Sequence, residues 1–373
     1  MSQALHLAST QSFQCHSCGR CCRNSWDIRV EAGARQGIAA SSAAQRCEKE
    51  GYLPLVVLAD GTVATGRRQD GACVFLTGKE LCSIHGELGG GRKPLACQLY
   101  PYSLTATPDG YFASLSFACP SVVEGVGGNL EANRRELQAL LEERSSGDVE
   151  VPHQVEIVAG RFVSWASYRA LEGKLLLAYR ADDPIGSLLD CAVGIVGAVI
   201  RGEETSPWPD LSTVIREEPF EESLLAMFCA SVIALWELPD HPEDRQAFSQ
   251  AVLSGLPVHS QRYDVPLPSL DFGKAEGQLI ETFDRYFANA IHGKSLLAGP
   301  VVSRLLALAC GCALVMYYGN AFRQAEGAAE LSWKALSRAF ELVEADLVTH
   351  TRSADPLFAA FEGSLCQAHQ IER

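Results

Sequence analysis

Four cysteines stand within eight positions near the start of this chain, in the segment FQCHSCGRCCRNSWDIRV at residues 13–30. They are Cys15, Cys18, Cys21 and Cys22. Thiols this close together bind a metal, exchange electrons or form disulfides, and each choice restricts the fold. A disulfide between the adjacent Cys21 and Cys22 would be strained, which disfavours pairing within the run. The spacing C-x2-C-x2-C-C therefore favours a metal or redox site.

The rest of the chain predicts a compartment in which disulfides are uncommon. The N-terminal segment lacks a basic stretch followed by an apolar one, so we expect no secretory signal and a cytoplasmic protein. The longest apolar run, residues 305–318, has 14 residues and predicts a buried helix, because a membrane span needs about 18 or more. With 47% apolar residues among 373, the chain can form its core by packing alone. Clustered cysteines in the cytoplasm more often bind metal than pair.

Cysteines and charges both divide the chain near residue 125. Nine of the 14 cysteines lie in the first 119 residues. Residues 1–125 hold 11 Lys and Arg against 10 Asp and Glu, whereas residues 126–373 hold 20 against 35. We predict an α+β protein with a small cysteine-rich metal-binding module at 1–125 and a larger all-α helical domain at 126–373. The acidic second part would repel phosphate, so we expect no nucleic-acid partner.

Periodic patterns place the elements within these two parts. Alternating runs predict strands at 25–30, at 53–66 on both sides of an Asp-Gly turn, and at 109–120. In the second part, apolar residues recur at helical spacing and are separated by Pro and Gly. These patterns predict helices at 129–144, 162–180, 184–202, 220–238, 244–256, 274–293, 301–318 and 331–350.

Four more cysteines bring the candidate metal ligands of the module to eight: Cys73, Cys82, Cys97 and Cys119. Eight thiols equal two sets of four, the ligand number of a tetrahedral zinc site or of an iron–sulfur cluster. The compact run favours iron–sulfur ligation over paired zinc knuckles, and zinc is the alternative. In extended backbone the adjacent Cys21 and Cys22 would point to opposite sides, so they could serve different metals or share one.

Several neighbours of these cysteines have less certain roles. His16 and His85 could ligate metal, although exposure to solvent is the alternative. Trp26 and Tyr100 could shield the site from water or simply pack in the core. Arg92 and Lys93 could donate to sulfur or lie on a solvated loop. Of the remaining cysteines, Cys47 lies on an expected helix outside the pattern, and five are expected to be small core residues: Cys191, Cys229, Cys310, Cys312 and Cys366.

The cysteine run, followed by CVFL, LCSIH and KPLACQLYP, resembles the CxxCxxCC (YkgJ-type) cysteine-cluster family, whose members are described as zinc- or iron-chelating. The aromatic residue after the run and the long helical domain resemble its flagellin lysine-N-methylase branch. That resemblance implies methylation of lysines on a protein such as flagellin, with S-adenosylmethionine and a cysteine-bound iron–sulfur cluster. The specific motifs cover residues 13–120, about a third of the chain.

No motif for a methyl donor accompanies the cysteines. The radical S-adenosylmethionine spacing C-x3-C-x2-C is absent, and no strand leads into a G-x-G-x-x-G turn. A lysine amine must lose its proton before it attacks a methyl group, and Tyr100 and Tyr102 are the nearest candidate bases. Two hypotheses follow: an iron–sulfur-dependent protein-lysine N-methyltransferase, or a non-enzymatic zinc- or iron-binding or electron-transfer module.

Overall fold

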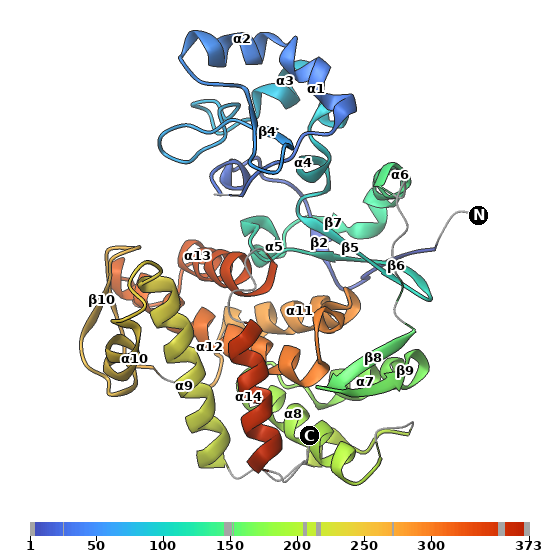
Figure 1. Ribbon diagram of the computed structural model, residues 1–373, viewed down its shortest axis with the longest axis vertical. Helices are drawn as coiled ribbons and strands as arrows, with labels where there is room; N and C mark the ends of the chain where they lie inside the picture. Colours follow the sequence, from blue (N-terminus) through green and yellow to red (C-terminus); the bar gives the residue numbers. More distant parts are fainter. Residues whose placement is uncertain are drawn as a thin grey trace.

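The computed structural model describes residues 4–24, 26–144, 151, 153–203, 207–213, 218–270, 272–349 and 355–368. Helices account for 54% and strands for 13% of the structure, which confirms the expected α+β class. Figure 1 shows a small upper lobe, a middle layer with short strands, and a larger helical part below.

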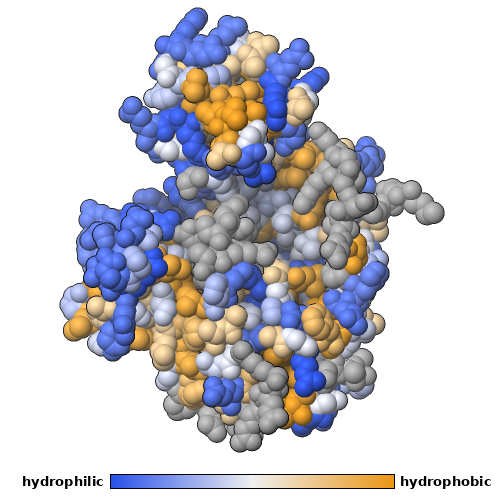
Figure 2. Space-filling view, viewed as in Figure 1, coloured by the Kyte–Doolittle hydropathy of each residue, from blue (hydrophilic) through white to orange (hydrophobic). Residues whose placement is uncertain are grey.

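The upper lobe is built from short helices around one hairpin. Its small core includes Ile38, Val74, Phe75 and Ile84. The predicted hairpin at 53–66 is confirmed, but the predicted strand at 25–30 is wrong, because only Arg29 forms a bridge, with Ala64, before the next helix begins. The elements are η1 (Arg20–Cys22), α1 (Ala32–Ala39), α2 (Ser42–Lys49), β3 (Leu55–Val57), β4 (Val63–Thr65), α3 (Ser83–Leu88) and η2 (Gly90–Arg92). Figure 2 shows an apolar patch on the surface of this lobe.

A three-stranded sheet forms the middle layer. Its order is β1-β6-β5, with β1 parallel to β6 and β5 antiparallel to it. The strand predicted at 109–120 is confirmed as β6, and one face of the sheet packs on Leu137 and Leu141 of α6. The elements are β1 (Leu5–Leu7), β2 (Ser12–Phe13), α4 (Leu95–Leu99), β5 (Tyr102–Thr107), β6 (Gly110–Leu115), α5 (Pro120–Glu124), β7 (Gly128–Asn129), η3 (Leu130–Asn133) and α6 (Arg134–Arg144).

The lower part is mainly helical, and each helix predicted from the sequence overlaps one in the structure. Two small hairpins, β8–β9 and β10–β11, were not predicted, nor was α14. The elements are β8 (Gln154–Val158), β9 (Arg161–Ser164), α7 (Trp165–Ala178), α8 (Pro184–Ile200), η4 (Leu211–Thr213), α9 (Glu218–Glu237), α10 (Arg245–Leu253), β10 (Val258–Ser260), β11 (Val265–Leu267), α11 (Gln278–His292), η5 (Ser295–Ala298), α12 (Val301–Ala325), α13 (Trp333–Val343), the π-helical η6 (Glu344–Thr349) and α14 (Asp355–Ala368).

Helix α12 lies at the centre of the helical part and packs against α8, α13 and α14. At 25 residues it is longer than the 14-residue run that predicted it, and among the described helices it alone is long and apolar enough to cross a membrane. In the structure, however, 94% of its most apolar window is buried by other elements. The expected buried helix is confirmed, and its residues Cys310 and Cys312 are buried in the core of the helical part.

The segment from β6 to α5 anchors the middle layer on the helices. The Asn289 side chain of α11 both donates to and accepts from the backbone of Leu115, at 2.8 Å each. Phe117 packs edge-on against Tyr286, with ring centroids 4.9 Å apart, and the guanidinium of Arg285 donates to the carbonyl of Val122 at 2.7 Å. Residues 115–123 therefore belong to the same core as the helices. The domain boundary at residue 125 stays a prediction.

Candidate metal centre

The eight candidate ligands lie where the upper lobe meets the middle layer, mostly on loops and element ends. All 14 cysteines are free thiols, so no disulfide competes for them. Cys15 and Cys18 lie on the loop after β2, Cys21 and Cys22 in η1, Cys73 and Cys82 on irregular bridged segments, Cys97 in α4, and Cys119 at the N-cap of α5. Cys15, Cys18 and Cys21 are exposed, and Cys119 is buried.

Tight turns and ion pairs hold the cysteine run in place. Gly19 has a φ of 69°, and a Cβ there would lie 2.5 Å from a carboxylate oxygen of Glu80, so only glycine fits. Arg23 donates to the Glu80 carboxylate at 3.0 and 2.5 Å, which ties the run to the 70–80 loop. Arg20 forms an ion pair with Glu341 of α13, which ties it to the helical part.

The adjacent Cys21 and Cys22 lie in a 3-10 turn, not in the extended backbone that the sequence suggested. Their thiols hydrogen-bond to each other. This bond, together with the charge of Lys93, lowers the pKa of Cys21 to about 7, while the same bond and burial raise that of Cys22 far above its ordinary range. The shared hydrogen bond shows that one of the two thiols becomes a thiolate readily.

A first group of thiols surrounds Cys22. The amide of Cys73 donates to the carbonyl of Cys22 at 2.7 Å, which joins two segments 51 positions apart. The thiolates of Cys73 and Cys82 raise the pKa of Cys22, and together with burial they raise that of Cys97 to about 12. Such mutual repulsion identifies Cys22, Cys73, Cys82 and Cys97 as electrostatic neighbours. Cys21 adds to the rise of the Cys97 pKa as well, so this thiol neighbours the first group and, through Tyr100, the second.

A second group surrounds Cys119. Burial raises the pKa of this thiol to about 11, and the thiolates of Cys18 and Cys15 add to the rise. Tyr100 connects the two groups, because Cys119 and Cys21 both contribute to the strong rise of its pKa. The eight thiols thus gather in two neighbouring sets within one small region.

Distances between the ligand atoms test which metal the thiols fit. Among the described residues, no three sulfurs lie within 4.8 Å of one another; the one group of three His, Cys, Asp or Glu ligand atoms at that spacing is the exposed set His241, Glu243 and Asp244. Four thiolates on a single zinc ion, each at about 2.3 Å, would lie roughly 3.8 Å apart. The thiol ligands suit zinc or iron by chemistry, but they are spaced more widely than a closed zinc tetrahedron.

Aromatic and basic side chains border the two sets. The Trp26 indole donates to the carbonyl of Cys21 at 3.2 Å, and its ring packs against Tyr100 with centroids 5.3 Å apart. The ammonium of Lys93 donates to the carbonyl of Cys97 at 3.1 Å, and its charge offsets part of the rise that burial causes in the pKa of that thiol. Both features match the expected shielding and charge compensation of a thiolate site.

The other histidine and cysteine candidates do not belong to the two sets of thiols. No interaction joins His16 or His85 to the cysteines among the residues that the structure describes. Cys47 is buried in α2, where its thiol donates to the carbonyl of Val74 at 3.4 Å. The five cysteines of the second part are buried core residues, as expected. Of these, the Cys229 and Cys310 sulfurs lie 3.4 Å apart.

The two candidate bases are poorly suited to accept a proton. Burial raises the pKa of Tyr102 to about 12 and that of Tyr100 still further. No sequence pattern singled out Glu344, which lies inside the helix predicted at 331–350 but in the structure begins its π-helical end, η6. Its carboxylate accepts hydrogen bonds from the Tyr286 hydroxyl at 3.0 Å and the Ser116 hydroxyl at 3.3 Å, and burial raises its pKa to about 7. A carboxylate with a pKa near 7 is a suitable general base.

Fold and site together define a cysteine-rich metal-chelating domain joined to a helical part. Residues 14–120 match the model of the CxxCxxCC family, described as a "Putative zinc- or iron-chelating domain". No curated protein and no solved structure matches this chain. The family match supports zinc or iron chelation by the N-terminal third, and it does not reach the flagellin lysine-N-methylase branch.

Proposed function

We propose that the N-terminal third holds two iron–sulfur centres, one on Cys22, Cys73, Cys82 and Cys97 and the other on Cys15, Cys18, Cys21 and Cys119. The observation that carries this division is the hydrogen bond from the Cys73 amide to the Cys22 carbonyl, which fixes one thiol of the run beside the 73–82 segment. Cys15 and Cys18 lie instead within electrostatic range of Cys119. The adjacent Cys21 and Cys22 would then serve different centres.

The compact C-x2-C-x2-C-C run supports iron–sulfur over zinc, because it resembles ferredoxin ligation and lacks a second C-x2-C knuckle. A single zinc ion needs its four thiolates roughly 3.8 Å apart, whereas a cluster of several iron and sulfide ions keeps its thiolate ligands farther from one another. The sulfurs of the described residues do not approach in threes within 4.8 Å. Zinc remains the alternative, and with it a non-enzymatic chelating or electron-transfer module. Reduced thiols in such numbers suit a cytoplasmic location.

Anaerobic purification followed by iron, sulfide and zinc quantification and a visible spectrum tests the proposal. We expect iron and sulfide in similar amounts and broad visible absorbance. Cys73→Ser and Cys119→Ser are each expected to remove about half of the iron, since each change breaks one centre. The buried core variant Cys191→Ser is the control and retains all of it. Stoichiometric zinc without iron in a well-folded sample contradicts an iron–sulfur protein.

Protein-lysine N-methylation is the second candidate function, and Glu344 favours it. This buried carboxylate and Cys119 are both within electrostatic range of Tyr100, so a proton acceptor lies close to the thiol region. The acidic second part, with 35 acidic against 20 basic residues, would attract a lysine-bearing substrate such as flagellin.

Incubating the anaerobic protein with labelled S-adenosylmethionine and flagellin tests this function. Methyl transfer that falls at least about a hundredfold in Glu344→Gln supports it, because a positioned base contributes about 10² to 10⁴ in rate. If a sample with its full content of iron and sulfide neither binds S-adenosylmethionine nor transfers a methyl group, the methylation function is wrong. Only the metal-binding function then stands.

A further inference from the structure

The polar face of the central sheet is only partly covered by helices: Ser103 is exposed at one end, whereas Ser114 is buried. Ser103 on β5 lies directly opposite Ser114 on β6, and Thr105 and Ser116 follow at alternate positions. Alternating polar residues usually mark the solvated side of an antiparallel sheet. Here α11 and η5 lie over that side, and Ser114 is only 7% exposed. A buried hydroxyl such as that of Ser114 needs a hydrogen-bond partner.

Between this row and the helices lies a cavity of about 330 Å³. Its lining includes Ser103, Ser114 and Ser295, and also Leu296, Leu297 and Leu308. Small-molecule sites begin at about 300 Å³ and combine an apolar wall with a few polar groups. The cavity therefore has the size and the mixed lining of a site for a small molecule.

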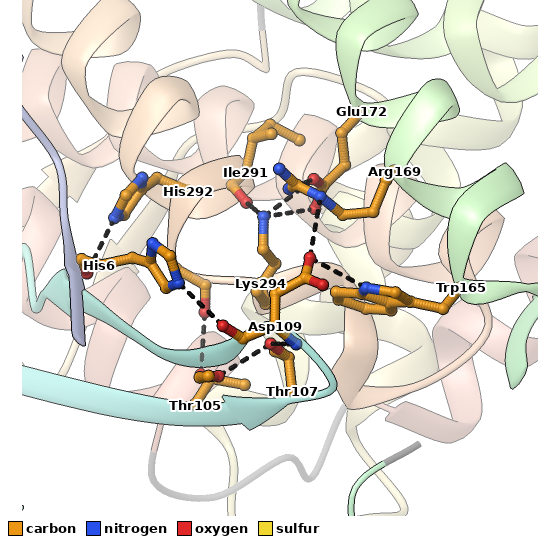
Figure 3. Close-up of polar contacts among 12 residues, drawn as sticks. His6, Thr105, Thr107, Asp109, Trp165, Arg169, Glu172, Ile291, His292 and Lys294 are labelled. Carbon is orange, nitrogen blue, oxygen red and sulfur yellow. Dashed lines mark hydrogen bonds and ion pairs between the residues drawn. The ribbon is translucent and has the colours of Figure 1, made fainter. Parts of the chain in front are cut away.

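The charged side chain nearest the hydroxyl row is already occupied. Figure 3 shows the ammonium of Lys294 pointing at Glu172 and at the carbonyl of Ile291. The ammonium nitrogen lies 2.8 and 2.9 Å from the two Glu172 oxygens and 3.4 Å from the Ile291 carbonyl oxygen. These contacts use all three N–H donors of the ammonium. A phosphate or carboxylate ligand would have to break this buried pair.

Other polar groups of the lining are also engaged. The Thr105 hydroxyl donates to the carbonyl of Gly293 at 2.9 Å. The Asn289 amide is bonded on both sides to the Leu115 backbone. Arg304 donates to Asp355 at 3.1 Å, so its charge has a carboxylate partner.

Three serine hydroxyls of the lining remain available to hydrogen-bond with a ligand. Within the described part of the chain, Ser103, Ser114 and Ser295 have no hydrogen-bond partner for their side chains, and Ser114 is more than nine-tenths buried. A serine hydroxyl both donates and accepts, so its best match is a group that does the same. We propose that this cavity binds a neutral polyhydroxylated molecule of monosaccharide size, with its hydroxyls on the three serines and its carbon face on the three leucines. Glu344, the candidate base above, also lines this cavity, but the binding proposed here requires neither the metal centre nor methyl transfer.

Calorimetric titration of the full chain, purified with its metal, tests the proposal with glucose, ribose and inositol as probes. Glucose 6-phosphate and gluconate are the charged counterparts. We expect at least one neutral probe to bind and its charged counterpart to bind more weakly. Ser114→Ala should weaken binding about tenfold through the lost hydrogen bond, and Ser249→Ala on α10, outside the lining, should leave it unchanged.

A second variant, Ala290→Leu, fills the cavity from α11 and should abolish binding while the far-ultraviolet circular dichroism and the metal content stay unchanged. If none of the neutral probes binds the unaltered chain up to the limit of solubility, or if only the charged ones bind, the proposal is wrong. Equal binding by the unaltered chain and by a folded Ala290→Leu variant places the ligand elsewhere and likewise overturns it.

Discussion

The ammonium of Lys294 lies 2.8 and 2.9 Å from the two carboxylate oxygens of Glu172, and both residues are only 3% exposed. The pair joins the segment after α11 to α7. Arg169 contacts the same carboxylate and also lies 3.6 Å from Asp109 in the β5–β6 turn, to which Trp165 donates at 3.0 Å. This network, drawn in Figure 3, fixes the sheet against the helices and so forms one end of the cavity.

Lys294→Met is expected to destabilise the protein by about 3–5 kcal/mol, because it leaves the Glu172 charge buried with one partner fewer. The double variant Lys294→Met with Glu172→Leu should recover most of this loss, since no buried charge then remains. Denaturant unfolding measures both. Arg201→Met, which breaks the exposed pair with Glu203, is the control and should change stability by less than about 1 kcal/mol. A double variant as unstable as the single one would contradict this account.

Gly19→Ala should reduce the bound metal, because its Cβ would collide with Glu80 in a backbone conformation that alanine rarely adopts. Gly51→Ala is the matched control in the same lobe: its φ of 83° carries the same backbone strain of about 1–2 kcal/mol, but no atom lies within 4 Å of the added Cβ. Metal analysis and thermal unfolding compare the two. Equal metal content in both variants would show that the Glu80 contact does not position the run.

Glu344 should make stability depend on pH in a defined direction. Burial raises its folded pKa from the ordinary 4.5 to about 7, so the native state holds this proton more tightly than the unfolded state does. The protonated Glu344 therefore adds roughly 3 kcal/mol to the free energy of unfolding below about pH 4.5, and this stabilisation is lost as the pH rises through 7. Unfolding followed from pH 5 to 8 should show this decline in the unaltered chain relative to Glu344→Gln. If the free energy of unfolding varied with pH in the same way for both proteins, the raised pKa of Glu344 would be ruled out.

Removing the metal should loosen the upper lobe and leave the helical part folded. The candidate ligands lie mainly on loops, and the core of the lobe is small, whereas α8 and α12 pack in a large core. After chelation, limited proteolysis should cut first within residues 14–100, and the helical circular dichroism should change little. Cleavage spread evenly over both parts would mean that the metal supports the whole fold.

The sequence by itself determined the long helices of the second part and the kind of chemistry of the first. Helical spacing located α8, α9 and α12, because local periodicity follows from which face of a helix is buried. The C-x2-C-x2-C-C run predicted a metal domain, which the family match supports, because thiols clustered at this density are typical of metal ligation.

Only the tertiary structure decided how these residues meet. It brought Cys73 beside Cys22, since the backbone hydrogen bond between them joins segments that no local pattern relates. It also buried Ser114 and Glu344 in the lining of one cavity. Burial and electrostatic neighbours arise from contacts between distant segments, so neither the pKa of a carboxylate nor the lining of a cavity can be read from the order of residues alone.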